Sequence, residues 1–394
     1  MTAALIVAGC ATAIALLYWL GMVYVILRTR WGMPRLEELT PPEPERWPKL
    51  SVIVPARNEA EDCEAAVQTL LDENYPELEI VLVDDRSTDA TGEILDRLAA
   101  GDARATALHI TELPEGWLGK VHALDRGLTA STGAFVLFTD ADVHFRRGTL
   151  RQAVAWALAQ ELDFLTALPT LWPTSLFLDS MIATFIRHLL VGTRPWNLGN
   201  SRSKAFFGVG AFNLVRRSAF DATEGFAWLR METADDAGLG YMMKKSGAKC
   251  SVVSAFEHVG LYWYHTPGEA ARGAEKGFAS VLRCSLVRGI VMALVMLTLE
   301  ISPMLVLLPL IFGMGIVGVS GIGVFVIFLI AMVLLARWAR VRLLPGLLGP
   351  LTAVFMAWVF VRVAVVGRRR GGALWRGTLY TSEELLTGRR VPLP

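Results

Sequence analysis

The chain has 394 residues, in which 38 Lys and Arg nearly balance 37 Asp and Glu, for a formal net charge of +1. This balance provides no extended positive field, which argues against a nucleic-acid partner. Hydrophobic residues make up 53% and charged residues 19% of the chain, too apolar for a purely soluble enzyme and too charged for a pure membrane bundle. The length suits one domain of about 250 residues plus membrane segments. The four cysteines are widely spaced and form no CxxC pair, which argues against a zinc site or a disulfide framework.

Residues 1–30 are predicted to form a transmembrane anchor. The stretch from Ala3 to Leu27 contains no charged residue and is long enough to cross a hydrocarbon core of roughly 30 Å. It lacks the basic leading region and the small-residue cleavage site of a signal peptide, so we expect it to be retained. Arginines follow it directly, and the excess of basic residues on the cytoplasmic side places the next part of the chain in the cytoplasm. Residues 31–48 contain PPEPERWP, which predicts a stiff, proline-rich linker.

From residue 49 to 285 the sequence alternates between strand, polar turn and helix. Runs of aliphatic and β-branched residues at 50–56, 78–85 and 133–142 predict strands. Alternation of this kind predicts an α/β domain whose parallel sheet is covered by helices on both faces. Ligands of such sheets bind outside the carboxyl ends of the strands, so the residues that follow each strand are the candidates for a site.

Residues 174–197 form a distinct segment within this domain. Apolar residues recur there at helical spacing, with Arg187, His188 and Arg194 among them. The segment is too interrupted to predict a membrane span and favours a helix lying in the membrane interface. A core helix of the α/β domain is the alternative. An interfacial helix would let a lipid hydroxyl approach the domain without leaving the bilayer.

Residues 286–366 are again apolar and predict two or three membrane helices. The glycine-rich stretch at 313–323 predicts either a tight turn or a small-residue packing face. Glu300 lies in the first of these helices, where a carboxylate is a functional candidate, unless the helix breaks at residues 302–303. Arginine clusters flank the last helix on both sides. The positive-inside tendency would therefore place both ends of this helix in the cytoplasm, which a single span cannot satisfy. We expect residues 367–394 to form a basic cytoplasmic tail.

Two carboxylates, Asp140 and Asp142, end the third predicted strand. On an extended segment they would point to opposite faces, but where the strand turns both can converge on one cation. Such oxygen ligands suit Mg²⁺ or Mn²⁺, which bind through one or two carboxylates and substrate phosphates. An ordinary strand-end turn explains a solitary D-x-D better. Here VDDRSTD at 83–89 and METADD at 231–236 add two further acidic sites on the same scaffold.

The motifs SVIVPARNEA, VLVDDRSTDAT, GKVHALDRGL, FTDAD and TADD resemble, in this order and spacing, those of inverting family 2 glycosyltransferases of the GT-A fold. The resemblance runs from Leu50 to Phe278. The membrane layout is similar to that of the lipid-glycosylating branch, which includes ceramide glucosyltransferases and hopanoid- and carotenoid-associated glycosyltransferases. The resemblance implies a Rossmann-like nucleotide-sugar domain with N-terminal and C-terminal transmembrane helices, in a bacterial plasma membrane with the catalytic domain in the cytoplasm.

The resemblance also implies a role for each matching residue. Asp236 matches the catalytic base, with Asp235 beside it. Asp140 and Asp142 match the metal and ribose site. The other matches imply contacts with the donor. They comprise the first loop, the acids that read the nucleotide base, and the basic residues near the diphosphate: Pro55, Ala56, Arg57, Glu59, Asp84, Asp85, Lys120, Arg272 and Lys276.

Together these matches imply transfer of one hexose from a nucleotide-sugar, expected to be a UDP-sugar, to a membrane lipid hydroxyl, with Mg²⁺ or Mn²⁺ as cofactor. The chemistry requires such residue types. The leaving diphosphate gains charge, which a divalent cation together with Lys or Arg offsets. A carboxylate within hydrogen-bond reach takes the proton of the acceptor hydroxyl, and an acid that faces the base accepts from its imide N–H.

Departures from the family pattern leave alternatives open. The family usually has Glu-Asp where this chain has Asp235 and Asp236. Processive synthases carry Q-x-x-R-W, of which EAARG at 269–273 retains only Arg272, so a single transfer is favoured over polymer synthesis. Arg272 and Lys276 also fit a basic face near acidic lipid headgroups. The rivals are a polyprenyl-phosphate glycosyltransferase, whose anionic acceptor needs no strong base, a processive polysaccharide synthase, and a non-catalytic binding module, against which the intact acids argue.

Overall fold

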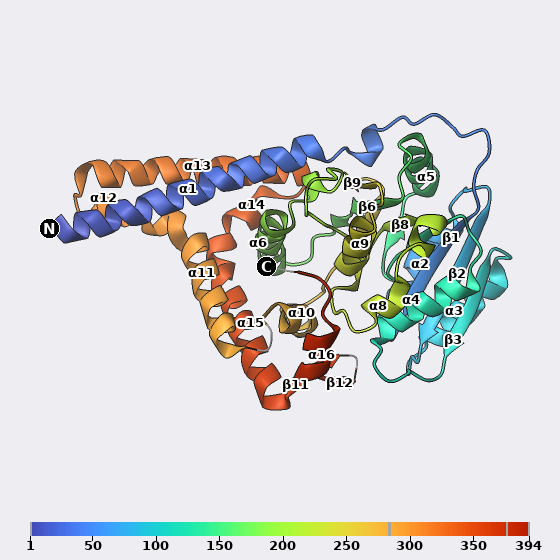
Figure 1. Ribbon diagram of the computed structural model, residues 1–394. Helices are drawn as coiled ribbons and strands as arrows, with labels where there is room; N and C mark the ends of the chain where they lie inside the picture. Colours follow the sequence, from blue (N-terminus) through green and yellow to red (C-terminus); the bar gives the residue numbers. More distant parts are fainter. Residues whose placement is uncertain (1, 283–284, 376, 393–394) are drawn as a thin grey trace.

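A seven-stranded sheet forms the centre of the α/β part of the chain (Figure 1). The computed structural model describes residues 2–282, 285–375 and 377–392. The strand order is β3-β2-β1-β4-β8-β6-β9. These strands are β1 Leu50–Ala56, β2 Leu78–Asp85, β3 Ala105–Ile110, β4 Phe135–Phe138, β6 Phe164–Leu168, β8 Asn213–Arg216 and β9 Cys250–Ser254. The α/β fold class and the three strands expected from the sequence are confirmed.

One strand departs from the expected parallel arrangement. β1, β2, β3 and β4 pair in parallel, and β6 pairs in parallel with β9, but β8 is antiparallel to both β4 and β6. A parallel neighbour needs a crossover that returns the chain to the opposite edge of the sheet. Before β8 the chain instead crosses the carboxyl edge as a loop that ends at Phe212, so it enters the sheet from that edge and runs in the opposite direction.

The alternation of side chains along β1 explains why helices cover both faces of the sheet. Val52 and Val54 belong to one buried cluster and Ile53 to another, because successive residues of a strand point to opposite faces. The first cluster includes the apolar residues of α2 (Cys63–Leu71), α3 (Thr91–Gly101) and α5 (Thr149–Ala159), and the second includes those of α4 (Gly119–Ala130).

Smaller elements complete this part of the chain. The three-stranded sheet has the order β5-β10-β7, and β11 and β12 form a hairpin. The bounds of the smaller strands and helices are β5 His144–Phe145, β7 Thr170–Leu171, β10 Val259–Leu261, β11 Gly372–Trp375, β12 Thr378–Thr381, α7 Arg217–Asp221, α8 Gly225–Leu229, α9 Asp235–Lys245, α10 Pro267–Leu282, α16 Ser382–Gly388, and the 3₁₀ turns Leu36–Glu38 and Pro195–Asn197.

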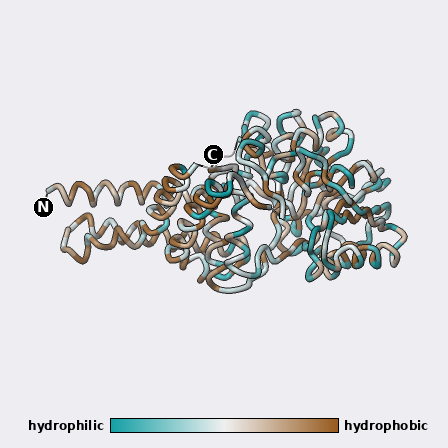
Figure 2. The backbone as a smooth tube through the Cα atoms, turned by 90° about the horizontal axis from the view of Figure 1, so that it is seen from below, coloured by the Kyte–Doolittle hydropathy of each residue, from teal (hydrophilic) through white to brown (hydrophobic). Residues whose placement is uncertain are grey.

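Within the described residues, five helical stretches are long and apolar enough to cross a membrane: Thr2–Gly32, Leu176–Asn197, Leu286–Ile311, Ile316–Ala339 and Gly349–Arg370. The helices in these stretches are α1 Thr2–Gly32, α6 Leu176–Thr193, α11 Leu286–Leu305, α12 Leu308–Ile311, α13 Gly315–Ala339 and α15 Gly349–Arg370, with the short α14 Leu343–Leu347 before α15. α1 packs along α13 and α11 along α15. Figure 2 shows that the apolar colouring concentrates in this arm of the molecule.

The segment predicted as a linker lies against the α/β domain. The backbone oxygen of Pro34 accepts a hydrogen bond from the Ser254 amide at 2.9 Å. The side-chain amide of Gln152 donates to the backbone oxygens of Leu36 and Leu39 at 2.6 and 2.8 Å. These bonds fix where the chain leaves α1 relative to the edge strand β9 and to α5.

The glycine-rich stretch at 313–323 serves both expected purposes. Gly313 and Gly315 have positive φ angles of 66° and 52°, which glycine adopts at little cost, and they form the turn before α13. Gly318 and Gly321 lie directly against the backbone at Leu310 and Val306. Small residues at this face let α13 approach the preceding segment closely.

A buried ion pair joins α6 to the membrane-type helices. Arg187 on α6 and Glu300 on α11 are both completely buried and form a salt bridge. Tyr18 on α1 donates to Glu300 at 3.4 Å. α11 continues through Pro303 to Leu305, so the break considered at residues 302–303 does not occur. Because α6 shares this polar contact, it packs as part of the helical arm rather than apart from it.

We expect Glu300→Ala to destabilise the protein strongly. The substitution would leave the Arg187 guanidinium buried without its anion, and breaking a buried pair in this way costs about 3–5 kcal/mol. The thermal midpoint of the purified protein in detergent should fall clearly. Glu64→Ala is the matched control, because Glu64 pairs with Arg97 on the surface and exposed pairs contribute about 1 kcal/mol or less. Equal midpoints for the two variants would contradict a structural role for the buried pair.

Candidate active site

Lys120 lies among three carboxylates at the carboxyl edge of the sheet. It is the second residue of α4. Its ammonium forms a salt bridge with Asp140, which follows β4, and a second one with Asp235 at 3.4 Å. Burial alone would lower the pKa of Lys120, but the carboxylates of Asp140, Asp235 and Asp236 raise it above its ordinary value. The cation is therefore held charged between segments that lie about a hundred residues apart.

Asp235 and Asp236 occupy the first turn of α9, where the helix dipole favours negative charge. One carboxylate oxygen of Asp236 accepts from the Gly210 amide at 3.0 Å and the other from the Ala237 amide at 2.7 Å. These bonds fix the orientation of the side chain. A small cavity lies between it, Lys120 and Asp140, with Phe226 and Leu239 among the apolar residues that line it.

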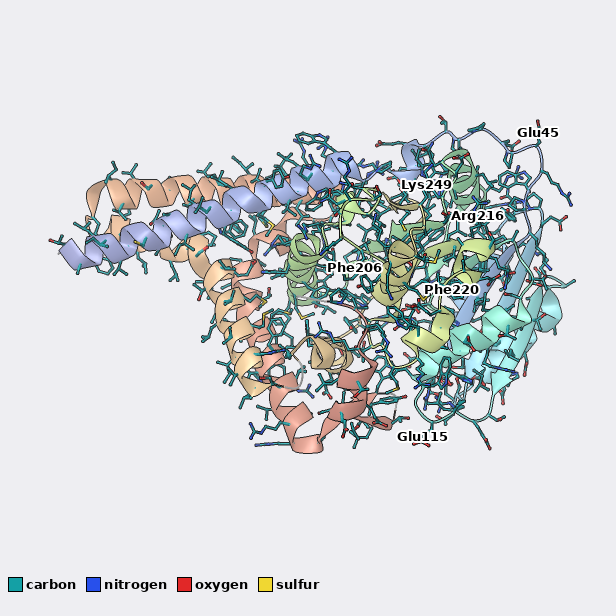
Figure 3. All side chains as sticks on the ribbon, viewed as in Figure 1. Glu45, Glu115, Phe206, Arg216, Phe220 and Lys249 are labelled. Carbon is teal, nitrogen blue, oxygen red and sulfur yellow. The ribbon has the colours of Figure 1, made fainter. Side chains whose placement is uncertain are left out.

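The loop from Ser203 to Phe212 passes directly over these acids. A Cβ atom at Gly208 would overlap the Asp236 backbone oxygen, and one at Gly210 would overlap the Asp140 carboxylate. The absence of a side chain at these two glycines therefore lets the backbone of the loop lie directly against the acids. Phe206 of this loop lies beside α9 (Figure 3) and packs against Tyr241 with ring centroids 5.0 Å apart.

Asp142 lies deeper, beside a second group of carboxylates. Burial raises the pKa of Asp142 to about 7, and the neighbouring Asp140 and Glu59 carboxylates act in the same direction. Crowding of acids without enough positive charge is what a divalent cation would relieve. Among the residues that the structure describes, no three His, Cys, Asp or Glu side chains enclose a metal ion by themselves. Asp140 and Asp142 therefore fit a cation that takes its remaining ligands from phosphate and water.

The loop after β1 connects this group with the acids at the end of β2. Arg57 lies 3.7 Å from Asp85 in a salt bridge, and Glu59 approaches Asp142. Pro55 and Ala56 are the last residues of β1. The predicted donor loop thus reaches both acidic strand ends.

Asp84 and Asp85 are buried and already have partners. Both oxygens of Asp85 accept from Arg86, at 2.7 and 3.1 Å. Asp84 accepts from the Ser87 amide at 3.0 Å and lies 3.1 Å from His109. Hydrogen bonds that the His109 ring donates to the carboxylates of Asp96 and Asp84 raise the pKa of His109. A nucleotide base that reached Asp85 would share this carboxylate with Arg86.

The structure brings some of the predicted site residues together and separates others. Lys120, Asp140, Asp235 and Asp236 line one cavity, whereas Asp85 and Asp142 are not part of its lining. Asp85 still touches the same helix terminus, because a Cβ atom at Gly119 would overlap its carboxylate. Arg272 lies on an exposed part of α10, and the side chain of Lys276 lies outside the described part of the chain.

The sequence motifs gave no role to several residues that lie at or beside the site. Arg86 has a positive φ of 57° and pairs with Asp85, and this backbone geometry could not be read from the sequence. Tyr380, on β12, is buried, and the Gly119 amide donates to its phenolic oxygen. Burial raises the pKa of Tyr380. Glu232, three residues before α9, is buried as well.

An aromatic path leads from the acidic edge towards α6. His144, two residues after Asp142, packs at a tilt against Trp172 with ring centroids 4.8 Å apart, and Trp172 packs edge-on against Tyr262 at 5.0 Å. The next residue, Trp263, packs against Phe185 of α6 at 5.2 Å. Tyr262 remains 41% exposed. Aromatic side chains therefore connect the acidic edge of the sheet with the apolar helix α6.

Comparison with known proteins places these observations in a family. The sequence profile of Glycosyl transferase family 2 matches residues 51–223. A putative teichuronic acid biosynthesis glycosyltransferase, TuaG, from Bacillus subtilis is 31% identical over 117 residues, which cover 30% of this chain and 45% of that protein. The 4,4'-diaponeurosporenoate glycosyltransferase of Staphylococcus aureus is 26% identical over 223 residues, 55% of this chain and 56% of that protein. The chain thus matches about half the length of these two relatives.

The fold also resembles that of a solved structure. A mannosyltransferase from Pyrobaculum calidifontis, determined in complex with GDP-Man and Mn²⁺, superposes with a TM-score of 0.52 at 20% identity, over 91% of this chain and 99% of that chain. This likeness supports a GT-A-like fold. The acidic strand ends and the sheet agree with the profile match, which assigns residues 51–223 of the chain to a Glycosyl transferase family 2 domain.

Proposed function

We propose that the protein is a membrane-bound, divalent-cation-dependent inverting glycosyltransferase that moves one hexose from a UDP-sugar to a lipid hydroxyl. The observation that carries the proposal is the cavity at the carboxyl edge of the sheet, where Lys120, Asp140, Asp235 and Asp236 meet. The Lys120 ammonium, the predicted metal ligand Asp140 and the predicted base Asp236 would all be within reach of one reacting centre in this cavity. The same chain contains helices of membrane-spanning length.

The donor diphosphate fits the N-terminus of α4. The helix dipole favours negative charge at the start of a helix, and Lys120 adds a full positive charge at the same place. Asp140 and Asp142 would hold Mg²⁺ or Mn²⁺, which would offset the charge that the leaving diphosphate gains. The mannosyltransferase with the similar fold was solved with Mn²⁺, which supports this choice. The loop from Pro55 to Glu59 and the acids at the end of β2 would face the nucleoside.

Asp236 would act as the base. Its carboxylate is oriented by the Gly210 and Ala237 amides and faces the cavity. A lipid hydroxyl entering there would give its proton to Asp236 while its oxygen attacks the anomeric carbon from the face opposite the diphosphate. Attack from that face inverts the anomeric centre, so no covalent enzyme intermediate is needed.

A lipid acceptor is supported by the surroundings of the cavity. The relative that acts on 4,4'-diaponeurosporenoate and the five helices of membrane-spanning length favour an apolar acceptor. α6 and the rings of Trp172, Tyr262 and Trp263 would guide its apolar part towards the acids. Work at a bacterial plasma membrane, with the catalytic domain on the cytoplasmic side, fits a nucleotide-sugar donor made inside the cell.

Asp236→Asn should abolish lipid glycosylation while leaving donor binding nearly intact. Loss of a general base costs about 10²–10⁴-fold in rate, and the amide keeps the shape of the side chain. Turnover is measured as nucleotide release in membranes, with mass spectrometry of lipids that gain one hexose. Asp221→Asn, on an exposed position of α7, is the matched control. Full turnover by Asp236→Asn would refute the base and would favour an already anionic polyprenyl-phosphate acceptor.

Replacing both Asp140 and Asp142 with Asn should remove the response of glycosyl transfer to added Mg²⁺ or Mn²⁺. Activity of the wild-type protein should be lost with EDTA and restored by Mg²⁺ or Mn²⁺, whereas the double variant should bind neither ion. Binding of Mn²⁺ alone, followed by electron paramagnetic resonance, gives a readout that does not depend on turnover. Asp72→Asn, at the exposed end of α2, is the control. Unchanged Mn²⁺ affinity in the double variant would place the cation elsewhere.

A further inference from the structure

The chain that follows α15 folds back onto the α/β domain. Arg362 and Arg370 of α15 pair with the buried Glu275 of α10 at 2.6 and 3.2 Å. The β11–β12 hairpin follows immediately, and α16 comes next (Figure 1). We call residues 372–375 and 377–392 the return segment. It lies outside the part of the chain that matches the family profile.

Glu232 binds the far end of the return segment. One carboxylate oxygen accepts from the backbone amides of Arg390 and Val391 at 2.7 and 2.9 Å. The other accepts from the amide of Ala234 at 3.1 Å, and Ala234 is the residue that immediately precedes α9. A single buried carboxylate therefore joins the return segment to the start of the helix that carries Asp235 and Asp236.

Close packing reinforces these bonds. Gly388 lies so near Met231 that a Cβ atom at this position would overlap the methionine side chain. Val391 is 1% exposed and lies 3.5 Å from the position that a Cβ atom would take at Gly238 of α9. Arg390 donates to the backbone oxygen of Trp228 at 3.2 Å. These contacts involve backbone atoms and glycines, which leave little room for movement. They therefore fix the distance between the return segment and the start of α9.

The near end of the return segment touches the other helix of the site. Tyr380 on β12 is 7% exposed and shares a buried cluster with Leu118 and Val121. Its phenolic oxygen accepts from the Gly119 amide, and Gly119 is the first residue of α4, next to Lys120. The return segment thus contacts the N-terminus of α4 as well as that of α9.

We propose that the return segment is a positioning element of the active site, which holds the N-termini of α4 and α9 at the separation that Lys120, Asp235 and Asp236 require. Glu232 and Tyr380 are its positioning residues and do not touch substrate. Because the β11–β12 hairpin directly follows α15, the position of this apolar helix determines how Asp235 and Asp236 are placed. The inference rests on the proposed function for the meaning of that geometry.

The test uses the full-length protein in lipid nanodiscs with the UDP-sugar and lipid extract of the assay above. Glu232→Gln replaces one of the two accepting oxygens with an NH2 group, so the side chain can keep the bonds to Arg390 and Val391 or the bond to Ala234, but not both. Gly388→Val forces the return segment away from Met231. Both variants should lower kcat by about 10- to 100-fold, because small displacements of catalytic groups have effects of this size, with donor affinity nearly unchanged. Tyr380→Phe should lower kcat in the same direction without altering the buried ring.

Matched controls separate positioning from general damage. Glu224→Gln alters a surface carboxylate that pairs with Lys245, and Gly101→Val adds a side chain where nothing lies within 4 Å of the new Cβ atom. Both should keep wild-type kcat. Hydrogen exchange should show faster exchange at Arg390, Val391 and the start of α9 in Glu232→Gln and Gly388→Val, with the central strands still protected.

Two results would overturn the inference. One is wild-type kcat in a variant whose return segment exchanges freely, and the other is unchanged exchange at α9 when Glu232 and Gly388 are replaced. Failure of the proposed function is seen separately, as a wild-type protein that releases no nucleotide from any donor. In that case exchange at the start of α9 still reports whether the return segment holds it.

Discussion

The placement of one ammonium among three carboxylates is the constraint on which the site depends. Lys120, Asp140, Asp235 and Asp236 come from α4, the turn after β4 and the start of α9, and each alone would be costly to bury. Their mutual attraction offsets that cost and ties the three segments together. Asp142 and Glu59 add further negative charge beside them. These acids would repel a negatively charged diphosphate unless a cation accompanied it, which is the reason for proposing a metal at Asp140 and Asp142.

This charge arrangement also explains the glycines around it. Gly208 and Gly210 bring the backbone against Asp236 and Asp140, and the Gly210 amide then donates to Asp236. A side chain at either glycine would push the loop outward and remove that bond. The loop therefore forms one side of the cavity through Gly210, while Phe226 of α8 and Leu239 of α9 line it with apolar side chains.

The sequence predicts the parts of this structure that depend on local pattern. Alternating Val52, Ile53 and Val54 specify a strand buried on both faces, and the acids after β2 and β4 lie at the carboxyl edge as the rule for parallel sheets requires. The antiparallel β8 could not be predicted, because its direction depends on where a long loop re-enters the sheet. The pairs Arg86–Asp85 and Arg187–Glu300 depend, respectively, on a left-handed backbone and on contact between helices 113 residues apart. Neither is a periodic feature of the sequence.

The joining of the helical arm to the sheet is what the proposed lipid acceptor would require on energetic grounds. Each methylene group taken from a bilayer into water costs about 0.8 kcal/mol, so removing a long chain whole would cost more than a typical binding site returns. An enzyme for such an acceptor must bring its acids to the membrane surface. The contact of Phe185 with Trp263 and the buried Arg187–Glu300 pair bind α6 to both parts of the molecule. With the proposed lipid acceptor, the acids could then meet the hydroxyl at the membrane surface while the aliphatic chain stays among the apolar helices.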